Sequence, residues 1–122
     1  MNKKILIIED DSFFHKFYTA KLSEKGYEVD FAENGKDGLT KLRNGNFHLV
    51  ILDLVMPQID GFAVLKERSH DENIQKIPFI VLTSLSQDKD SEEVKSLGAN
   101  DYINKTFTNI PELLMKINKL IG

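Results

Sequence analysis

Three uninterrupted apolar runs constrain the fold of this chain more than any other feature of its sequence. The runs are Ile5–Ile8, Leu49–Leu52 and Phe79–Leu82, and each is rich in β-branched residues. A strand with one solvated face alternates apolar and polar residues, whereas a strand covered on both faces reads as a continuous apolar run. The three runs therefore predict central strands of a parallel sheet that has helices on both faces.

Two weaker segments complete the predicted sheet. Residues 27–31 alternate apolar and polar side chains, and residues 101–103 form a very short apolar segment, so we expect both at the sheet edges. Amphipathic segments separate the five strands. They predict helices around Phe14–Leu22, Leu39–Leu42 and Phe62–Arg68, over Asp88–Leu97 and from Pro111 to Ile121, with glycines Gly26, Gly45 and Gly98 near helix ends.

The alternation of strands and helices predicts an α/β fold with a doubly wound, five-stranded parallel sheet. Strand order 2-1-3-4-5, that of a flavodoxin-like three-layer sandwich, puts the apolar strands in the centre and the polar ones at the edges. In this order the winding reverses between the first and third strands, and ligands bind at the carboxyl ends of the strands there. The 122 residues fit a single domain, residues 1–122.

Residue types suited to phosphoryl chemistry follow the predicted strands. Glu9 and Asp10 follow the first run, and Asp53 follows the second. Carboxylates that meet at one crevice raise each other's pKa unless a cation intervenes, and Mg²⁺, or Mn²⁺ in its place, prefers such oxygen ligands. Thr83 ends the fourth strand, where it would supply a hydrogen-bond donor. Lys105 follows the fifth strand, where it would supply a positive charge. The set predicts magnesium-assisted phosphoryl transfer to Asp53 as carboxylate nucleophile.

Four motifs make the whole chain resemble the receiver domain of two-component response regulators, the CheY-like superfamily. They are ILIIEDD, LVILDLVMPQIDG, IPFIVLTS and DYINK, in the order and at the separations of that family. The resemblance implies that Asp53 accepts a phosphoryl group. It also implies that Asp10 binds Mg²⁺ directly, that Glu9 acts through water, and that the backbone carbonyl of Val55 completes the protein ligands.

The same resemblance implies how the phosphoryl group is received and read. Thr83 and Lys105 would hold its oxygens, and Tyr102 would be an aromatic switch that turns inward as Thr83 moves. The donor would be a phosphohistidine of a sensor histidine kinase or of a histidine phosphotransfer protein. The output would pass through the face formed by residues 88–97, 101–103 and 111–121. The chain would catalyse only its own phosphorylation and dephosphorylation, so it is not expected to be an enzyme.

One position departs from the pattern of the family. Proline usually follows the lysine, joined to it by a cis bond, whereas Thr106 follows Lys105 here. A cis bond before a residue other than proline costs about 3–4 kcal/mol. The departure bears on the placement of Lys105 and on switching at Tyr102, and it leaves the acidic residues untouched.

Simpler interpretations compete at several positions. Asp11 is expected to cap the first helix rather than bind metal. The simpler interpretation of Thr83 is an ordinary strand end, and that of Lys105 is an exposed lysine. Tyr102 would then be a packed residue of an edge strand. Phe13 lies off the apolar stripe of its helix, so it either packs locally or sits exposed where a kinase helical bundle docks. The histidines show no ligand spacing and are expected to be non-catalytic; they are His15, His48 and His70.

Two other function classes were weighed against a phospho-acceptor. A pseudo-receiver, a protein-binding module that works without phosphorylation, normally lacks an acid, the threonine or the lysine, and all are present here. A phosphatase of the haloacid dehalogenase type needs a second aspartate two positions after the nucleophile, where this chain has Val55.

Composition narrows the setting. The chain has no cysteine, which excludes thiolate metal sites, and its net charge of -3 argues against direct nucleic-acid binding. No apolar run approaches membrane-spanning length, so a cytoplasmic protein is expected. No DNA-binding segment follows the last helix, which predicts a stand-alone receiver or one excised from a longer protein with an output domain. Its partners would be the kinase and a downstream protein, with the chain monomeric or dimerising upon phosphorylation.

Overall fold

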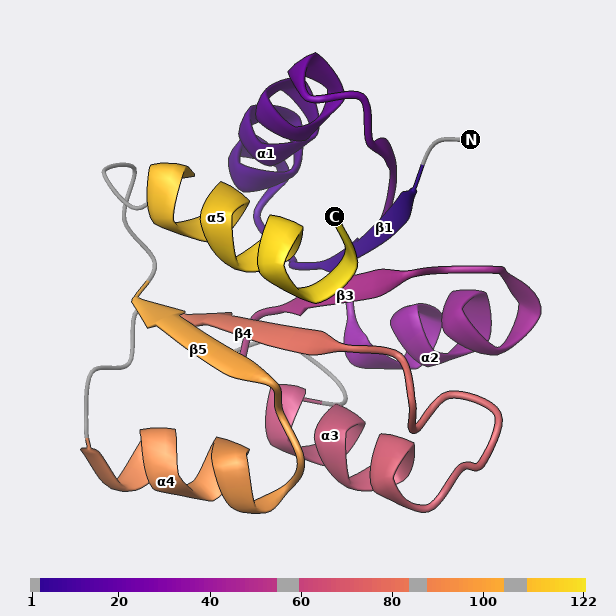
Figure 1. The fold of residues 1–122 in the computed structure, drawn as a ribbon. Helices are drawn as coiled ribbons and strands as arrows, with labels where there is room; N and C mark the ends of the chain where they lie inside the picture. The colour runs from indigo at the N-terminus through magenta and orange to yellow at the C-terminus, as the bar shows by residue number, and fades with distance from the viewer. Residues whose placement is uncertain (1–2, 55–59, 84–87, 105–109) are drawn as a thin grey trace.

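A five-stranded parallel sheet lies between two layers of helices (Figure 1). The computed structural model describes residues 3–54, 60–83, 88–104 and 110–122. In chain order the elements are β1 (Lys4–Ile8), α1 (Ser12–Glu24), β2 (Glu28–Ala32), α2 (Gly35–Asn44), β3 (Leu49–Leu52), α3 (Gly61–Ser69), β4 (Phe79–Thr83), α4 (Asp88–Ser96), β5 (Asp101–Asn104) and α5 (Ile110–Ile121).

The strand order confirms the prediction from the apolar runs. The sheet runs β2-β1-β3-β4-β5, and all four strand pairs are parallel. The three central strands are the three continuous apolar runs, and the two polar strands lie at the edges. The β2 edge differs slightly from expectation, because it begins at Glu28 and ends at Ala32, one residue later than the predicted 27–31.

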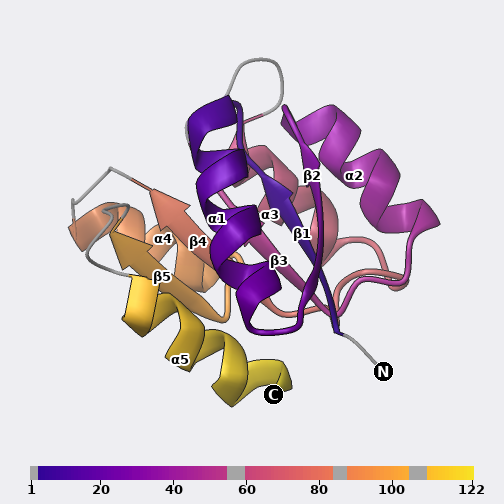
Figure 2. The same cartoon turned by 90° about the horizontal axis from the view of Figure 1, so that it is seen from above.

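Each face of the sheet is covered by its own set of helices and its own apolar cluster. Helices α1 and α5 cover one face, and α2, α3 and α4 cover the other (Figures 1 and 2). Because side chains alternate along a strand, Ile5 and Ile7 join the cluster under α1 and α5, while Leu6 and Ile8 join the cluster on the opposite face. This alternation determines the direction in which the residues that follow each strand will point.

The helix ends follow the sequence signals closely. The Asp11 side chain accepts a hydrogen bond from the Phe13 amide at 2.8 Å, so Asp11 is the predicted N-cap of α1. Gly26 and Gly98 follow α1 and α4 with φ of 88° and 96°, a left-handed conformation that glycine adopts without strain. The chain thus enters α1 immediately after the acidic segment that follows β1.

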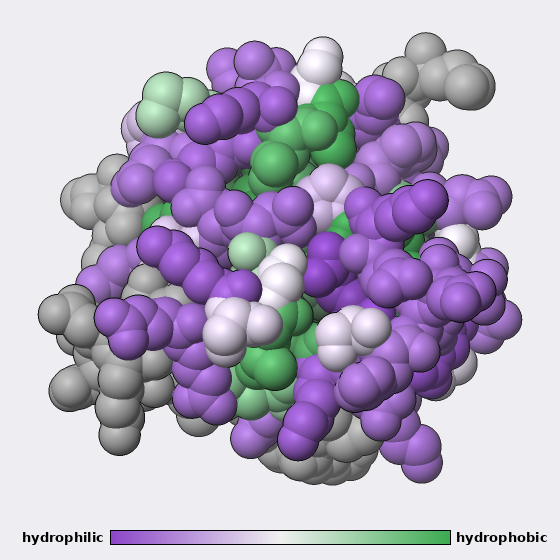
Figure 3. All heavy atoms as spheres, turned by 60° about the horizontal axis from the view of Figure 1, so that its bottom comes forward, coloured by the Kyte–Doolittle hydropathy of each residue, from purple (hydrophilic) through white to green (hydrophobic). Residues whose placement is uncertain are grey.

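The outer surface is largely polar on the face opposite α1. Figure 3 shows the molecule with the bottom of Figure 1 turned forward. Most of the coloured surface in this view is hydrophilic, and the apolar residues form smaller patches between the hydrophilic ones. Within the described part of the chain, no helix has the length and apolar character that crossing a membrane requires.

Candidate functional site

Three carboxylates converge where strands β1 and β3 end. The Asp53 amide donates to the Ile8 carbonyl at 3.0 Å, so the residues that follow the two strands lie side by side. Glu9, Asp10 and Asp53 each offer a carboxylate oxygen, and these oxygens all lie within 4.8 Å of one another. Glu9 and Asp53 are only 3% and 6% exposed, whereas Asp10 is exposed. The structure therefore brings together the acidic residues that the sequence predicted; we call them the acidic trio.

The turn from β1 into α1 separates the trio from its acidic neighbour. The Asp11 amide donates to Glu9 Oε1 at 3.1 Å, and the Asp11 side chain turns away to cap α1. Glu9 is thereby held by the backbone of the turn. The predicted division of the three consecutive acids is confirmed for Asp11, which belongs to the helix.

Gly61 supports the other side of the trio from the start of α3. Its amide donates to the Leu54 carbonyl at 3.0 Å. A Cβ atom at this position would lie 2.4 Å from the Asp53 carbonyl oxygen and 2.6 Å from Leu54 Cα. Because real Cβ atoms do not approach backbone so closely, only glycine fits here without moving the segment that carries Asp53.

The donor set of the trio fits a hard divalent cation. Carboxylate oxygens are the ligands that Mg²⁺ prefers, and it is usually held by one or two of them together with water or phosphate oxygens. Three negative charges within 4.8 Å repel one another, and a cation between them removes that repulsion. The exposed Asp10 leaves one side of the group open to solvent. The backbone carbonyl of Val55, the fourth predicted ligand, lies outside the described residues.

Two other predicted site residues lie on β4, which is next to β3, and on β5 beyond it. The register pairs Leu52 with Val81, so Thr83, the last residue of β4, belongs to the strand beside Asp53 and reaches one residue further along the sheet. Tyr102 pairs with Val81 on the other side of β4 and packs, half-buried, against the cluster under α2, α3 and α4. Lys105, Thr106 and the bond between them fall outside the described residues.

A buried arginine is the charged residue that the sequence analysis did not single out. Arg68 on α3 is 5% exposed. Its guanidinium donates to the Ile77 carbonyl at 3.2 and 2.8 Å, to the Gly98 carbonyl at 2.9 Å and to Asn100 Oδ1 at 3.3 Å. Burial lowers the pKa of Arg68 from its ordinary value. Its position on the apolar stripe of the helix was the available signal, since an arginine there must either be paired or leave the core.

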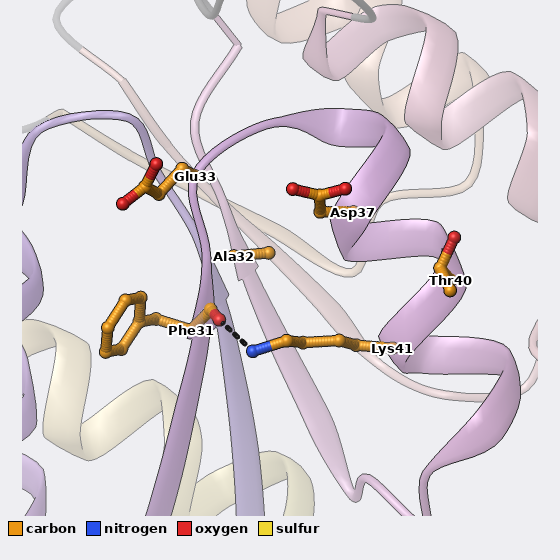
Figure 4. A pocket seen from close by; sticks show the side chains of 6 residues that line it. All are labelled: Phe31, Ala32, Glu33, Asp37, Thr40 and Lys41. Carbon is orange, nitrogen blue, oxygen red and sulfur yellow. Dashed lines mark hydrogen bonds between the residues drawn. The ribbon is translucent and has the colours of Figure 1, made fainter.

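The two larger cavities lie away from the trio, on either side of Phe31 at the β2 edge. One, of about 440 Å³, is a largely apolar groove between α1 and β2, with His15 and Phe31 in its wall. The other, of about 350 Å³, lies between β2 and α2 (Figure 4). Lys41 reaches across the second cavity to the Phe31 carbonyl at 2.6 Å and to Asp30 at 3.0 Å. Neither cavity contains a residue that the sequence analysis linked to phosphoryl chemistry.

Comparison with known proteins agrees with the geometry. Residues 5–118 match the family model described as "Response regulator receiver domain". The chain is 40% identical over 114 residues to the transcriptional regulatory protein DltR of Streptococcus agalactiae, a match that covers 93% of this chain and 50% of DltR. It is 35% identical over 118 residues to the response regulator ArlR of Staphylococcus saprophyticus, covering 97% of this chain and 52% of ArlR. The chain thus spans about half the length of these relatives.

Solved structures share the fold over their whole length. The receiver domain of the Francisella response regulator 1452 superposes with a TM-score of 0.91 at 32% identity, covering 98% of this chain and 97% of that one. TrrA of Thermotoga maritima, solved in complex with Mg²⁺-BeF, superposes with a TM-score of 0.86 at 36% identity, covering 97% and 98%. By its fold, its acidic trio and these matches, the chain belongs to the response regulator receiver domain family of two-component systems.

Proposed function

We propose that this chain is a phospho-acceptor receiver in which Asp53 takes a phosphoryl group from a phosphohistidine in a Mg²⁺-dependent reaction. The observation that carries the proposal is the convergence of Glu9, Asp10 and Asp53 within 4.8 Å at the carboxyl ends of β1 and β3. The structural likeness to TrrA, which was solved with Mg²⁺-BeF, supports the same assignment. The donor is a sensor histidine kinase or a histidine phosphotransfer protein.

In this reaction a carboxylate oxygen of Asp53 forms a bond to phosphorus, and the bond from phosphorus to the histidine nitrogen breaks. Asp10, Asp53 and the Val55 carbonyl would hold Mg²⁺ directly, with Glu9 acting through water. The cation, when bound, supplies neutralisation of the negative charge on the transferred group. Thr83 and Lys105 would hold the phosphoryl oxygens from the neighbouring strands. The reaction is limited to phosphorylation and dephosphorylation of the chain itself.

The output of the switch is proposed to pass through α4, β5 and α5. Tyr102 lies in the middle of β5, half-buried against the core, which gives an inward turn of its ring a place to go. DltR carries the name of a transcriptional regulatory protein and is about twice as long as the matched region. The target is therefore either an output domain in the same polypeptide or a separate protein. The chain works in the cytoplasm as a monomer or as a phosphorylation-dependent dimer, without contacting nucleic acid or membrane itself.

The docking surface for the phosphoryl donor is proposed at the start of α1. Phe13 is 58% exposed, and its ring stacks on that of Phe17 with centroids 6.3 Å apart. Both residues belong to the first half of α1, which begins three residues after Glu9. An exposed phenylalanine that stacks on a half-buried one, close in sequence to the acidic trio, suits contact with the apolar seam of a helical bundle.

A phosphorylation-independent pseudo-receiver remains the second candidate. It shares the fold and would bind a partner through the same faces, but it has no use for a preserved acidic trio. The presence of all three acids, with two of them buried at a cost, favours the phospho-acceptor.

Labelling with acetyl phosphate tests the proposal. With Mg²⁺ the wild-type protein is expected to become phosphorylated, and Asp53→Asn is expected to abolish the label because its amide is a poor nucleophile. Asp11→Asn is the matched control, since asparagine caps a helix equally well and Asp11 lies outside the trio. Persistent labelling of the Asp53→Asn protein would place the acceptor elsewhere. Absence of label in the wild-type protein would favour the pseudo-receiver.

A further inference from the structure

The hydroxyl of Tyr18 is a buried polar group with an unexplained position. Tyr18, on α1, is 2% exposed, and its hydroxyl oxygen has no hydrogen-bond partner within the part of the chain that the structure describes. Buried hydroxyl groups are nearly always paired with protein or with an ordered water, because an unpaired one loses the hydrogen bonds that water gave it. The Tyr18 hydroxyl therefore calls for a reason.

Packing accounts for the ring of Tyr18 and not for its oxygen. The ring stacks on Phe14 with centroids 5.6 Å apart and meets Phe17 edge-on at the same distance. It belongs to the apolar cluster under α1 and α5. Phenylalanine would make all of these contacts without burying a hydroxyl group. The oxygen adds a cost that the core gains nothing from.

The sheet face that Tyr18 packs on leads directly to the acidic trio. Ile7 and Ile51 share its apolar cluster. Because side chains on a strand point to the same face at every second residue, Glu9 and Asp53 continue this face beyond the two isoleucines. Burial raises the pKa of the Tyr18 hydroxyl above its ordinary value of 10.0, and the negative charges of Glu9 and Asp53 raise it further. Tyr18 thus covers the sheet face that Glu9 and Asp53 continue, and the charges of both acids act on its hydroxyl.

We propose that Tyr18 is a positioning residue of the cation site, whose hydroxyl donates a hydrogen bond through one bound water to the Glu9 carboxylate. A carboxylate accepts about four hydrogen bonds, so Glu9 can keep the bond from the Asp11 amide and take another. A buried water needs two to four polar partners, and the Tyr18 hydroxyl with the Glu9 and Asp53 carboxylates supplies three. The Tyr18 hydroxyl would then orient the Glu9 carboxylate for its contact with the hydration shell of Mg²⁺.

The inference rests on the cation-binding part of the proposed function and not on phosphorylation. Partners that orient metal-binding groups typically change metal affinity by about 10–100-fold when they are removed. Since Tyr18 would act on Glu9, which itself acts through water, we expect the lower end of this range. A residue that merely packs would change the stability of the fold and leave the affinity for Mg²⁺ alone.

The test is a Mg²⁺ titration of the wild-type protein, Tyr18→Phe and Tyr27→Phe, followed through the NMR amide signals of Asp10 and Asp53. Tyr18→Phe is expected to raise the Kd for Mg²⁺ about tenfold. Tyr27→Phe is the matched control, because Tyr27 packs against the same apolar cluster but precedes β2, at the opposite ends of the strands. Saturating Mg²⁺ is expected to restore the rate of labelling by acetyl phosphate in Tyr18→Phe, which separates affinity from catalysis.

A second measurement uses the wild-type protein alone. With ¹³C-labelled tyrosine, the ring signal of Tyr18 is expected to shift during the titration while that of Tyr27 stays in place. A Kd of Tyr18→Phe within twofold of the wild-type value, or a Tyr18 signal that ignores Mg²⁺, would overturn the inference. If the wild-type protein binds Mg²⁺ without becoming labelled, the phospho-acceptor function fails while the role of Tyr18 is still decided by the two Kd values.

Discussion

Two sites with buried charged side chains, at opposite ends of the parallel strands, contrast sharply. Arg68 lies among oxygen acceptors, with hydrogen bonds to Ile77, Gly98 and Asn100 and its guanidinium 4.7 Å from the centre of the Phe79 ring. Each of these neighbours complements a positive charge. In the acidic trio, by contrast, the carboxylate oxygens of Glu9, Asp10 and Asp53 lie within 4.8 Å of one another. The positive charge of Arg68 is therefore surrounded by complementary groups, whereas the trio brings three groups of like charge together.

The difference indicates what each site is for. A buried charge surrounded by complementary groups stabilises the elements that supply them, so Arg68 joins α3 to the segments before β4 and β5. A cluster of like charges stabilises nothing by itself, because each carboxylate raises the free energy of the others. Binding of a cation lowers this repulsion. Arg68 thus has a structural role, whereas the trio suits the cation-binding role proposed above.

Removing the positive charge of Arg68 tests the structural half of this comparison and carries the largest expected effect. Arg68→Met fills a similar volume but removes the guanidinium donor from three acceptor oxygens, those of Ile77, Gly98 and Asn100. We expect a loss of about 3 kcal/mol in the free energy of unfolding, measured by urea denaturation. Lys66→Met, an exposed change on the same helix, is the control and should stay within about 0.5 kcal/mol of the wild type. Equal stability of both variants would show that the arginine is dispensable.

Removing a negative charge from the trio should act in the opposite direction. In Mg²⁺-free buffer, Asp53→Asn is expected to raise the free energy of unfolding by about 1 kcal/mol, because one source of like-charge repulsion is lost. Saturating Mg²⁺ should erase this gain, since the cation stabilises the wild-type protein more strongly. Asp60→Asn, at the exposed N-cap of α3, should change little under either condition. A destabilised Asp53→Asn protein without Mg²⁺ would mean that the trio is not repulsive.

The smallest expected effect concerns Tyr18 at alkaline pH. Its pKa is raised in the folded protein by burial and by the charges of Glu9 and Asp53, so above pH 10 the unfolded chain loses the Tyr18 proton while the folded chain retains it. The stability that this group contributes is complete below pH 10 and falls as pH rises further. At pH 10.5 the wild-type protein should lose about 0.8 kcal/mol more than Tyr18→Phe, relative to pH 8. Parallel pH profiles of the two proteins would show that the Tyr18 hydroxyl is not buried in the folded protein.

Residues with a strong local signal were predicted well. The apolar runs identify the central strands, and strand order 2-1-3-4-5 predicts that Glu9, Asp10 and Asp53 lie together, as the structure shows. Asp11 was assigned to the helix cap by its position alone. These predictions succeeded because continuous apolar runs, helix caps and the ends of parallel strands each have a local signature in the sequence.

Partnerships across the fold had no such signature. Arg68 was placed on its helix, but its acceptors are two backbone carbonyls and an asparagine side chain from other segments, and every residue carries a carbonyl. Gly61 lets α3 approach the backbone of Asp53, a contact between segments that no local pattern indicates. Tyr18 belongs to the predicted helix around Phe14–Leu22, but only the folded chain shows that its hydroxyl is buried without a hydrogen-bond partner among the described residues.

The sequence by itself therefore determined the layers, the strand order and the identity of the acids at the reversal of the sheet, since hydrophobic periodicity and strand polarity decide these features. The tertiary structure alone decided which polar groups are buried and what surrounds them. Burial and hydrogen bonding depend on segments that are distant along the chain, as Arg68 and Tyr18 illustrate. A buried charged or polar group stabilises or destabilises the fold according to its neighbours, which only the folded chain supplies.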